Sequence, residues 1–388
     1  MTLLTLASKQ IWPQVLAVVH LKPRCLILLH SEDVAESKGP AQRLKRFFDD
    51  AGLVPKGATR LEPIPHDDFN GIERRLDELV ATRQLDLGEC LLNFTGGNKL
   101  MATAAFRWAA KRGLKSFYLE RGQQLTWFEP REGELLNRTE KLDGHLTDHL
   151  DPVALLRCQL DASEVQRPGQ KLVLNEAGQK LAEPEFLRRL QNGNDARPWL
   201  RFTGEADRQA KDGDALEFAV AAALLKLGVR QVQRSLRLKV KSTQQVGTRL
   251  PHAEIDLLFT WGGRLWLVDC KDRMPAQDLV ANLRRHLPRS LAPDADDLLT
   301  RISEELLISQ TKVMKEDLLA VREAGGLLGN VVCVRKANLP EEVVQFARHN
   351  HIAVIRKSEL VEGLRNLLFP ARPANQADLR TLAAHFRK

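Results

Sequence analysis

The sequence predicts an α/β protein with two α/β domains joined by a small helical connector. With 388 residues the chain exceeds one typical domain, and its hydrophobic content of 43% is enough for more than one core. Short apolar runs alternate with amphipathic stretches over residues 1–145 and again over residues 205–388. Between these regions, residues 146–204 combine short helical patterns with scattered prolines, which is typical of a connector.

In residues 1–145, strand patterns alternate with helical ones. Apolar runs predict strands at 2–6, 24–30, 58–63 and 89–94, and amphipathic spacing predicts helices at 11–21, 41–51, 70–83 and 99–112. Residues 116–120 and 125–129 predict a closing strand and hairpin. This alternation implies a mostly parallel sheet with helices on both faces, whose ligands bind beyond the carboxyl ends of the strands.

The second region repeats the alternation in different proportions. Its patterns predict a helix at 214–227, strands near 231–240, 253–260 and 265–270, a long helix at 298–323 and a strand at 330–334. One more strand is expected from residues 348–351 to Arg356, and the tail from Phe369 predicts a short exposed helix.

Composition excludes several classes of protein. The longest apolar run, 218–225, is cut at Lys226, far short of the roughly 20 residues that span a bilayer. The first ten residues lack the cationic start of a secretory signal. Five cysteines with no close pair argue against a disulfide framework and a cysteine-based zinc site. We therefore expect a soluble cytoplasmic protein with no membrane association.

The net charge of +8 is concentrated in one stretch of the second region. Between Glu217 and Glu254 there is no acidic residue, while seven basic residues occur there. These are Lys226, Arg230, Arg234, Arg237, Lys239, Lys241 and Arg249. Such an excess is typical either of a site for a polyanion or of a solvated surface, and the choice depends on neighbouring chemistry.

A glycine loop follows the fourth predicted strand. Residues 93–101, Asn-Phe-Thr-Gly-Gly-Asn-Lys-Leu-Met, connect that strand to a helix, where free N–H groups attract anions. Thr95 and Asn98 add hydrogen-bonding groups, and Lys99 adds positive charge. The loop matches neither a Walker A motif nor the G-x-G-x-x-G fingerprint. A tight turn with a capping threonine is the alternative interpretation.

The pattern N-x-T-G-G-[TN]-K-x-M in this position resembles the signature of CARF domains, the CRISPR-associated Rossmann-like sensors. CARF domains act as homodimers that bind a cyclic oligoadenylate between the glycine loops of both subunits. The resemblance implies that the loop residues contact the phosphates and riboses of the ligand, while residues after the first two strands line the rest of the pocket. The loop residues are Asn93, Thr95, Gly96, Gly97, Asn98 and Lys99, and the others are Ser8, Gln10 and Ser31.

Two carboxylates and a lysine stand out in the second region. Asp256 lies in the strand pattern before the Gly262-Gly263 turn, and Asp269 and Lys271 lie in the one after it. A hairpin through this turn brings the two aspartates together, and side-chain alternation places Asp269 and Lys271 on one face. Oxygen ligands beside a cation are typical of a divalent-metal site that hydrolyses phosphodiesters.

With the acid Glu217 on the preceding helix, this order resembles the PD-(D/E)XK nuclease superfamily, although Ile255 stands where the motif names proline. The resemblance implies that Glu217, Asp256, Asp269 and Lys271 are catalytic. Asp256, Asp269, Glu217 and the backbone carbonyl of Cys270 would hold Mn²⁺ or Mg²⁺. The basic residues Lys239 and Lys241 would then line a nucleic-acid cleft.

Together the two regions are similar to the type III CRISPR ancillary nucleases, which join a Rossmann-like CARF sensor to a PD-(D/E)XK restriction-endonuclease-like domain. The boundaries are 1–145 for the sensor, 146–204 for the connector and 205–388 for the nuclease. The resemblance implies a homodimer, activated by cyclic tetra-adenylate, that cleaves single-stranded DNA or RNA, with nicking of duplex DNA left open. Three alternatives also stay open: a nucleic-acid-binding regulator without nuclease activity, a ring nuclease that degrades the cyclic ligand, and a DNA-repair nuclease indifferent to oligoadenylates.

Overall fold

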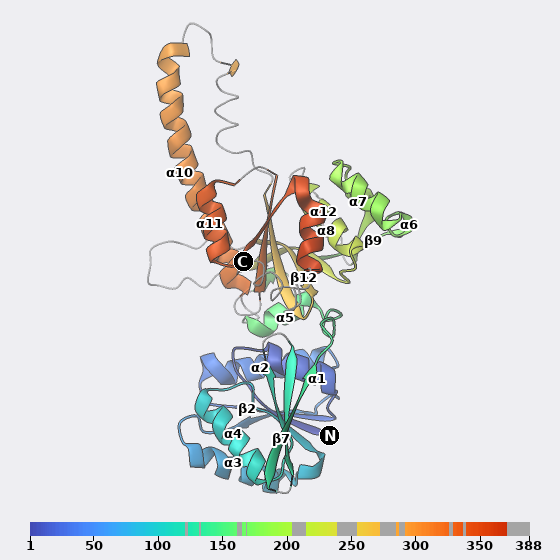
Figure 1. Cartoon of the computed structure of the whole chain (residues 1–388), viewed down its shortest axis with the longest axis vertical. Helices are drawn as coiled ribbons and strands as arrows, with labels where there is room; N and C mark the ends of the chain where they lie inside the picture. Colours follow the sequence, from blue (N-terminus) through green and yellow to red (C-terminus); the bar gives the residue numbers. More distant parts are fainter. Residues whose placement is uncertain are drawn as a thin grey trace, which may run out of the picture.

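The computed structural model describes residues 1–120, 123–131, 133–160, 165–167, 169–203, 215–238, 254–271, 285–286, 292–325, 329–336 and 339–370. The predicted nucleic-acid residues Lys239 and Lys241 lie outside these ranges, as does most of the predicted C-terminal helix. The described residues form two sheets, one in each half of the molecule, stacked along its longest axis (Figure 1).

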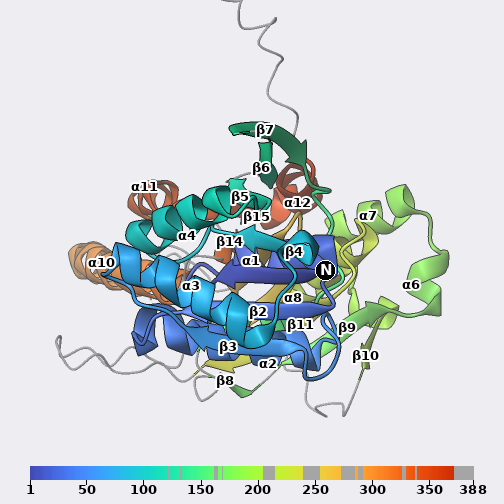
Figure 2. The same cartoon turned by 90° about the horizontal axis from the view of Figure 1, so that it is seen from below.

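The first sheet has seven strands in the order β3-β2-β1-β4-β5-β6-β7. They are β1 (Thr2–Leu6), β2 (Cys25–His30), β3 (Thr59–Pro63), β4 (Cys90–Asn93), β5 (Ser116–Glu120), β6 (Gln124–Arg131) and β7 (Glu134–Lys141). β1 to β5 are parallel, and β6 and β7 add an antiparallel hairpin at one edge (Figure 2). Exposed side chains line almost all of β7, so it has no apolar alternation from which to predict it.

Helices cover both faces of this sheet. They are α1 (Trp12–Leu21), the π-helical η1 (Val34–Lys38), α2 (Gly39–Asp50), α3 (Phe69–Arg83), the short 3₁₀ turn η2 (Leu87–Glu89) and α4 (Lys99–Lys111). Successive residues of each strand point to opposite faces of the sheet and so into two different cores. Leu3 and Leu28 pack with α1 and α2 on one face, whereas Leu4 and Leu29 pack with α3 and α4 on the other. This two-sided burial explains why the strands are continuous apolar runs.

The second sheet follows the order β10-β9-β11-β12-β13-β14-β15, and β8 also pairs with β11. The strands are β8 (Val165–Arg167), β9 (Gln170–Leu174), β10 (Leu200–Thr203), β11 (Val232–Leu238), β12 (Glu254–Trp261), β13 (Arg264–Lys271), β14 (Gly329–Arg335) and β15 (Ala353–Arg356). β13, β14 and β15 are parallel to one another, and the remaining pairs are antiparallel.

Two groups of helices cover this sheet on opposite faces (Figure 1). α8 (Ala215–Lys226) and α12 (Leu360–Leu368) pack on one face, and α5 (Pro152–Gln159), α10 (Ala292–Gly325) and α11 (Glu341–His349) pack on the other. The remaining elements are α6 (Glu176–Lys180), α7 (Glu183–Gln191), η4 (Arg197–Trp199) and η7 (Lys357–Glu359). No helix among the described residues is both long and apolar enough to cross a membrane.

The segment between the two predicted domains contributes more than helices. It supplies α5, α6 and α7, but also β8, β9 and β10, which extend the second sheet beyond β11. The described prolines of this segment, Pro152, Pro184 and Pro198, lie at helix starts, so they do not interrupt the short strands between the helices.

Candidate functional site

The glycine loop joins β4 to α4 at the carboxyl end of the first sheet. Asn98 caps α4, because its side-chain oxygen accepts the Met101 N–H at 2.8 Å, so the cap is not the expected threonine. Thr95 instead ties the loop to the sheet. Its Oγ1 donates to Asn93 Oδ1 at 2.6 Å and accepts the Leu119 N–H at 2.8 Å.

The two glycines allow the loop to pass closely over the end of β1. A Cβ at position 96 would lie 2.0 Å from the Leu6 carbonyl oxygen and 2.6 Å from Gln14 Nε2, so only glycine fits there. Gly97 has a φ of 73°, in the left-handed region that favours glycine. The loop is therefore a tight turn, and its close approach to β1 requires the absence of a side chain at position 96.

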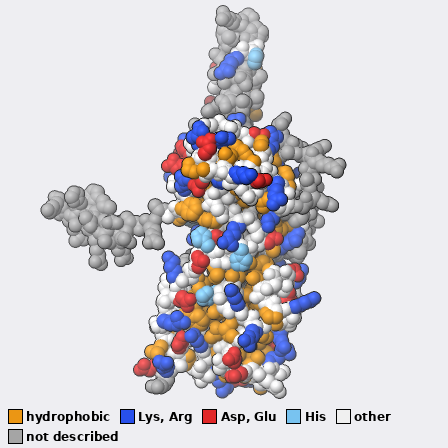
Figure 3. Space-filling model, turned by 90° about the vertical axis from the view of Figure 1, so that its right-hand side faces the viewer, with side chains coloured by type: hydrophobic (Ala, Val, Ile, Leu, Met, Phe, Trp, Pro, Cys, Tyr) orange, Lys and Arg blue, Asp and Glu red, His pale blue; other side chains and the backbone are white. Residues whose placement is uncertain are grey.

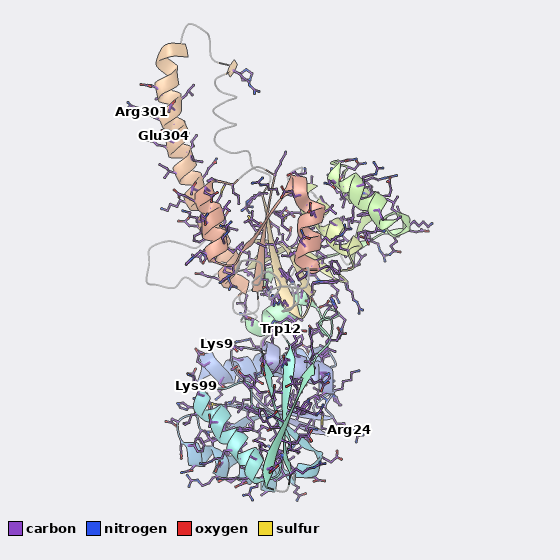
Figure 4. The ribbon with its side chains drawn as sticks, viewed as in Figure 1. Lys9, Trp12, Arg24, Lys99, Arg301 and Glu304 are labelled. Atoms are coloured by element: carbon purple, nitrogen blue, oxygen red, sulfur yellow. The ribbon has the colours of Figure 1, made fainter. Side chains whose placement is uncertain are left out.

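Positive charge lies beside this loop. Lys99 is exposed and has no ion-pair partner among the described residues, whereas Lys9 pairs with Glu36. Both lysines lie on the same edge of the first domain, and Arg24 lies on the opposite edge (Figure 4). Within the described part of the chain, the carboxyl edge of the sheet therefore presents at least one exposed, unpaired cation, Lys99, to an anion.

The other predicted ligand residues converge on the same edge but differ in exposure. Gln10 is exposed and Ser8 is half-buried, whereas Ser31 is only 4% exposed. The Ser31 N–H donates to Ser37 Oγ at 3.0 Å, and that hydroxyl donates to the Ala7 carbonyl at 2.9 Å. Ser8 and Gln10 are thus accessible to a ligand, while Ser31 lies in a network that joins β1, β2 and η1.

In the second domain, β12 and β13 form the predicted hairpin. Gly262 and Gly263 have φ values of 61° and 68°, and a tight turn with two positive φ angles favours glycine at both positions. The register pairs Leu257 with Val268, so Asp256 and Asp269 occupy the next pair. Asp256 Oδ2 accepts the Cys270 N–H at 2.6 Å, which joins the carboxylate of one strand to the backbone of the other.

The two aspartates are buried and carry different charge preferences. Asp256 is 7% exposed, and burial together with the negative charge of Asp269 raises the pKa of Asp256 to about 8. Burial also opposes ionisation of Asp269, but the cations of Arg335 and Lys271 outweigh it and hold the pKa of Asp269 below its ordinary value. The charge of Asp269 is thus balanced by partner cations, whereas burial and the charge of Asp269 disfavour ionisation of Asp256.

Lys271 and Arg335 divide the oxygens of Asp269 between them. Lys271 Nζ lies 3.0 Å from Asp269 Oδ1, and Arg335 Nη2 lies 2.6 Å from Asp269 Oδ2. Asp317 of α10 also acts on Lys271, because its negative charge helps to raise the pKa of Lys271 against the effect of burial. Sequence reasoning missed Arg335, because the predicted strand stopped one residue before it.

Glu217 lies in the first turn of α8, where its carboxylate pairs with Arg234 of β11 at 2.8 Å. Its charge still contributes to the raised pKa of Asp256.

The described part of the chain contains no cluster of three His, Cys, Asp or Glu side chains that could hold a metal ion. The donors of Asp256 and Asp269 are hard oxygens of the kind that divalent cations prefer. Their mutual repulsion fits a cation between them, so the residues fit a two-carboxylate site.

The turn of this hairpin is held by Gln123, which lies between β5 and β6 of the first sheet, and by residues that follow β7. Gln123 Nε2 donates to the Gly262 carbonyl at 2.9 Å, and the Gly263 N–H donates to Asp148 Oδ1 at 3.3 Å. His145 pairs with Asp148 at 2.7 Å and packs edge-on against Trp261. Figure 3 shows histidine side chains at this boundary between the two halves. We call Gln123, His145 and Asp148 the turn clamp.

No protein-family model matches this chain, and no curated protein matches it. Solved structures do share its fold. Can2 from Sulfobacillus thermosulfidooxidans, solved in complex with cyclic tetra-adenylate, matches 95% of this chain and 99% of its own, with a TM-score of 0.54 and 17% identity. Protein VC1899 from Vibrio cholerae matches 95% of this chain and 97% of its own, with a TM-score of 0.56 and 16% identity.

At these identities the likeness shows the fold alone. It confirms the predicted fold class, in which a Rossmann-like α/β domain is followed by a second α/β domain.

Proposed function

We propose that this protein is a metal-dependent nuclease of type III CRISPR defence, which cyclic tetra-adenylate activates by binding between the first domains of a homodimer. The substrate would be single-stranded DNA, RNA or both. One observation carries the proposal: Asp256, Asp269 and Lys271 meet on adjacent strands of a chain that also carries the glycine loop. That chain shares its fold, over 95% of its length, with Can2 in its complex with cyclic tetra-adenylate.

The first domain binds the cyclic ligand through its carboxyl edge. The N–H groups at the start of α4 and the ammonium of Lys99 would receive phosphate oxygens. The side chains of Asn98 and Thr95 are engaged within the loop, so their role is to hold its shape. Gly96 keeps the loop close to β1, where Ser8 and Gln10 contact the rest of the ligand.

The second domain supplies the hydrolytic groups. Asp256, Asp269 and the Cys270 carbonyl would hold Mn²⁺ or Mg²⁺, with Glu217 in electrostatic contact. When bound, such a cation polarises the scissile phosphate and lowers the pKa of a bound water. Lys271 is 29% exposed, so its ammonium can turn from Asp269 toward the substrate and neutralise charge that develops on the phosphate. Lys239 and Lys241 would contact the nucleic-acid backbone.

Activation requires that the ligand bind one arrangement of the two domains more tightly than the other. Rotation of the nuclease domains would complete the substrate cleft. The turn clamp supports this proposal, because it connects the first sheet and the residues after β7 to the hairpin that carries both aspartates.

The test is cleavage of labelled single-stranded DNA and RNA with Mn²⁺, with and without cyclic tetra-adenylate. Wild-type protein is expected to cut only with the ligand. Lys271→Ala is expected to abolish cutting and retain ligand binding, and Lys99→Ala to weaken activation. Arg24→Ala is the matched control, because this cation lies on the opposite edge of the first domain (Figure 4). Cleavage that does not depend on the ligand would contradict the proposed role of the first domain as a sensor.

A second candidate is a ligand-gated nucleic-acid-binding regulator without nuclease activity. It is favoured by the pairing of both Asp269 oxygens with cations and of Glu217 with Arg234. Nucleic-acid binding that responds to the ligand, with no cleavage under any metal condition, would support this candidate. Loss of cyclic tetra-adenylate over time in an Asp269→Ala protein would instead indicate a ring nuclease in the first domain.

A further inference from the structure

Arg335 is the last residue of β14 and lies beside the carboxylate centre. β14 runs parallel to β13, and the register places Arg335 directly across from Lys271. Its side chain is 4% exposed, and Asp269 is 1% exposed. Their 2.6 Å contact is therefore a buried, charge-assisted hydrogen bond, which is the strong kind.

The two cations that contact Asp269 differ in how freely their side chains can move. Lys271 is 29% exposed and holds Oδ1 at the end of a flexible side chain. Arg335 holds Oδ2 from within the protein, where its planar guanidinium has little room to rotate. A ligand or substrate that reaches this centre can displace the ammonium from Oδ1 far more easily than the guanidinium from Oδ2.

Burial of Arg335 lowers the stability of the fold. Its Nε and Nη1 atoms are buried without a hydrogen-bond partner among the described residues, and the neighbouring Cys333 thiol is only a weak acceptor. Unpaired buried donors cost stability, and a buried ion pair gives little more stability than well-packed apolar side chains would. The fold alone therefore gives little reason for an arginine at this position.

We infer that Arg335 is a positioning residue of the catalytic centre, which fixes the Asp269 carboxylate by Oδ2 and so presents Oδ1 to the metal and the reacting phosphate. This inference rests on the proposed function. Partners of metal-ligating carboxylates commonly play this role, and their loss typically lowers metal affinity or activity by roughly 10- to 100-fold.

The test measures Mn²⁺ binding to the full chain by electron paramagnetic resonance, alongside ligand-activated cleavage. Arg335→Met is expected to weaken Mn²⁺ binding at least about tenfold, because Asp269 loses its fixed orientation. The kcat for cleavage is expected to fall while KM for nucleic acid changes little. Arg335→Lys, which keeps the charge without the planar fork, is expected to recover part of both losses.

Arg356→Met is the matched control. Arg356 pairs with Arg335 in the register of β14 and β15 but is exposed, so its loss is expected to leave Mn²⁺ affinity and kcat unchanged. If Arg335→Met binds Mn²⁺ as tightly as wild type, or more tightly, Arg335 is only a counter-ion and the inference is wrong. If Arg335→Met fails to fold, the same comparison with Arg335→Lys decides.

The outcomes also separate this inference from the proposed function. A wild-type protein that binds Mn²⁺ but cuts nothing would contradict the nuclease, whereas weaker Mn²⁺ binding by Arg335→Met would still support positioning. A wild-type protein that binds no Mn²⁺ would overturn both.

Discussion

The glycine loop and the carboxylate centre are two polar sites built in opposite ways. In the loop, the internal hydrogen bonds of Thr95 and Asn98 are neutral, and the cation Lys99 stays in solvent. In the centre, charges are buried and paired with each other, as in Asp269 and Arg335. A loop of the first kind can bind and release a charged ligand at little cost. The second kind is preorganised, because its charges have already lost their water.

The largest effect is expected from breaking the buried pair. Asp269→Asn leaves Arg335 without its anion, so we expect at least about a 100-fold loss of cleavage. We also expect a loss of roughly 3 kcal/mol in the stability of the second domain, measured by chemical denaturation.

The double variant Asp269→Asn with Arg335→Met is the informative control for stability. Because it removes the unpaired charge, it is expected to regain most of the lost stability while cleavage stays absent. If the double variant is as unstable as the single one, charge burial is not what distinguishes this centre from the loop.

The fold was largely predictable because its signals are local. The continuous apolar runs of β1, β2 and β4 and the Gly262-Gly263 turn have the patterns that buried strands and tight hairpins require. The exposed hairpin strand β7 and the short strands β8 to β10 have weaker patterns. They are held mainly by pairing with neighbours, which the sequence does not display.

The residues of the site likewise fall into those that local patterns predict and those that only the packing of distant elements determines. Asp256, Asp269 and Lys271 were predictable as neighbours, because a hairpin and side-chain alternation determine their positions. Arg335 was not, since its contact with Asp269 joins residues 66 positions apart across a parallel pair. The pairing of Glu217 with Arg234 also depends on how α8 packs on the sheet, which periodicity does not fix.

The next largest effect is expected at the closest backbone approach in the loop. Gly96→Ala would place a Cβ 2.0 Å from the Leu6 carbonyl oxygen, so the loop must move away from β1. We expect a stability loss of about 3 kcal/mol and no detectable binding of cyclic tetra-adenylate by calorimetry.

Gly97→Ala is the control for the loop. Its Cβ would meet only side-chain atoms, at 3.3 Å and beyond, so backbone strain of about 1 kcal/mol is the main cost. Equal loss of ligand binding in both variants would show that left-handed strain, and not the contact with β1, determines the shape of the loop.

A smaller effect is expected where the two regions meet. Gly263→Ala would place a Cβ 1.7 Å from Gln123 Nε2, which displaces this side chain from the Gly262 carbonyl. Ligand affinity is expected to change little, while maximal ligand-activated cleavage falls several-fold, consistent with coupling energies of about 1 kcal/mol.

Gly262→Ala separates this contact from backbone strain. Position 262 has a similar φ, and a Cβ there has no neighbour within 4 Å. If the two alanine variants activate equally well, the turn clamp does not transmit the signal between the domains.

The smallest effect is expected at Lys99, because its charge is exposed and screened by salt. Lys99→Ala is expected to weaken binding of cyclic tetra-adenylate by about 5- to 10-fold at low ionic strength, and by less at 0.5 M salt. Titrations at several salt concentrations measure the difference. Lys99→Arg is expected to keep most of the affinity. A loss that is equally large at every salt concentration would mean that Lys99 is desolvated in the complex, and the loop would then resemble the carboxylate centre more than the free structure indicates.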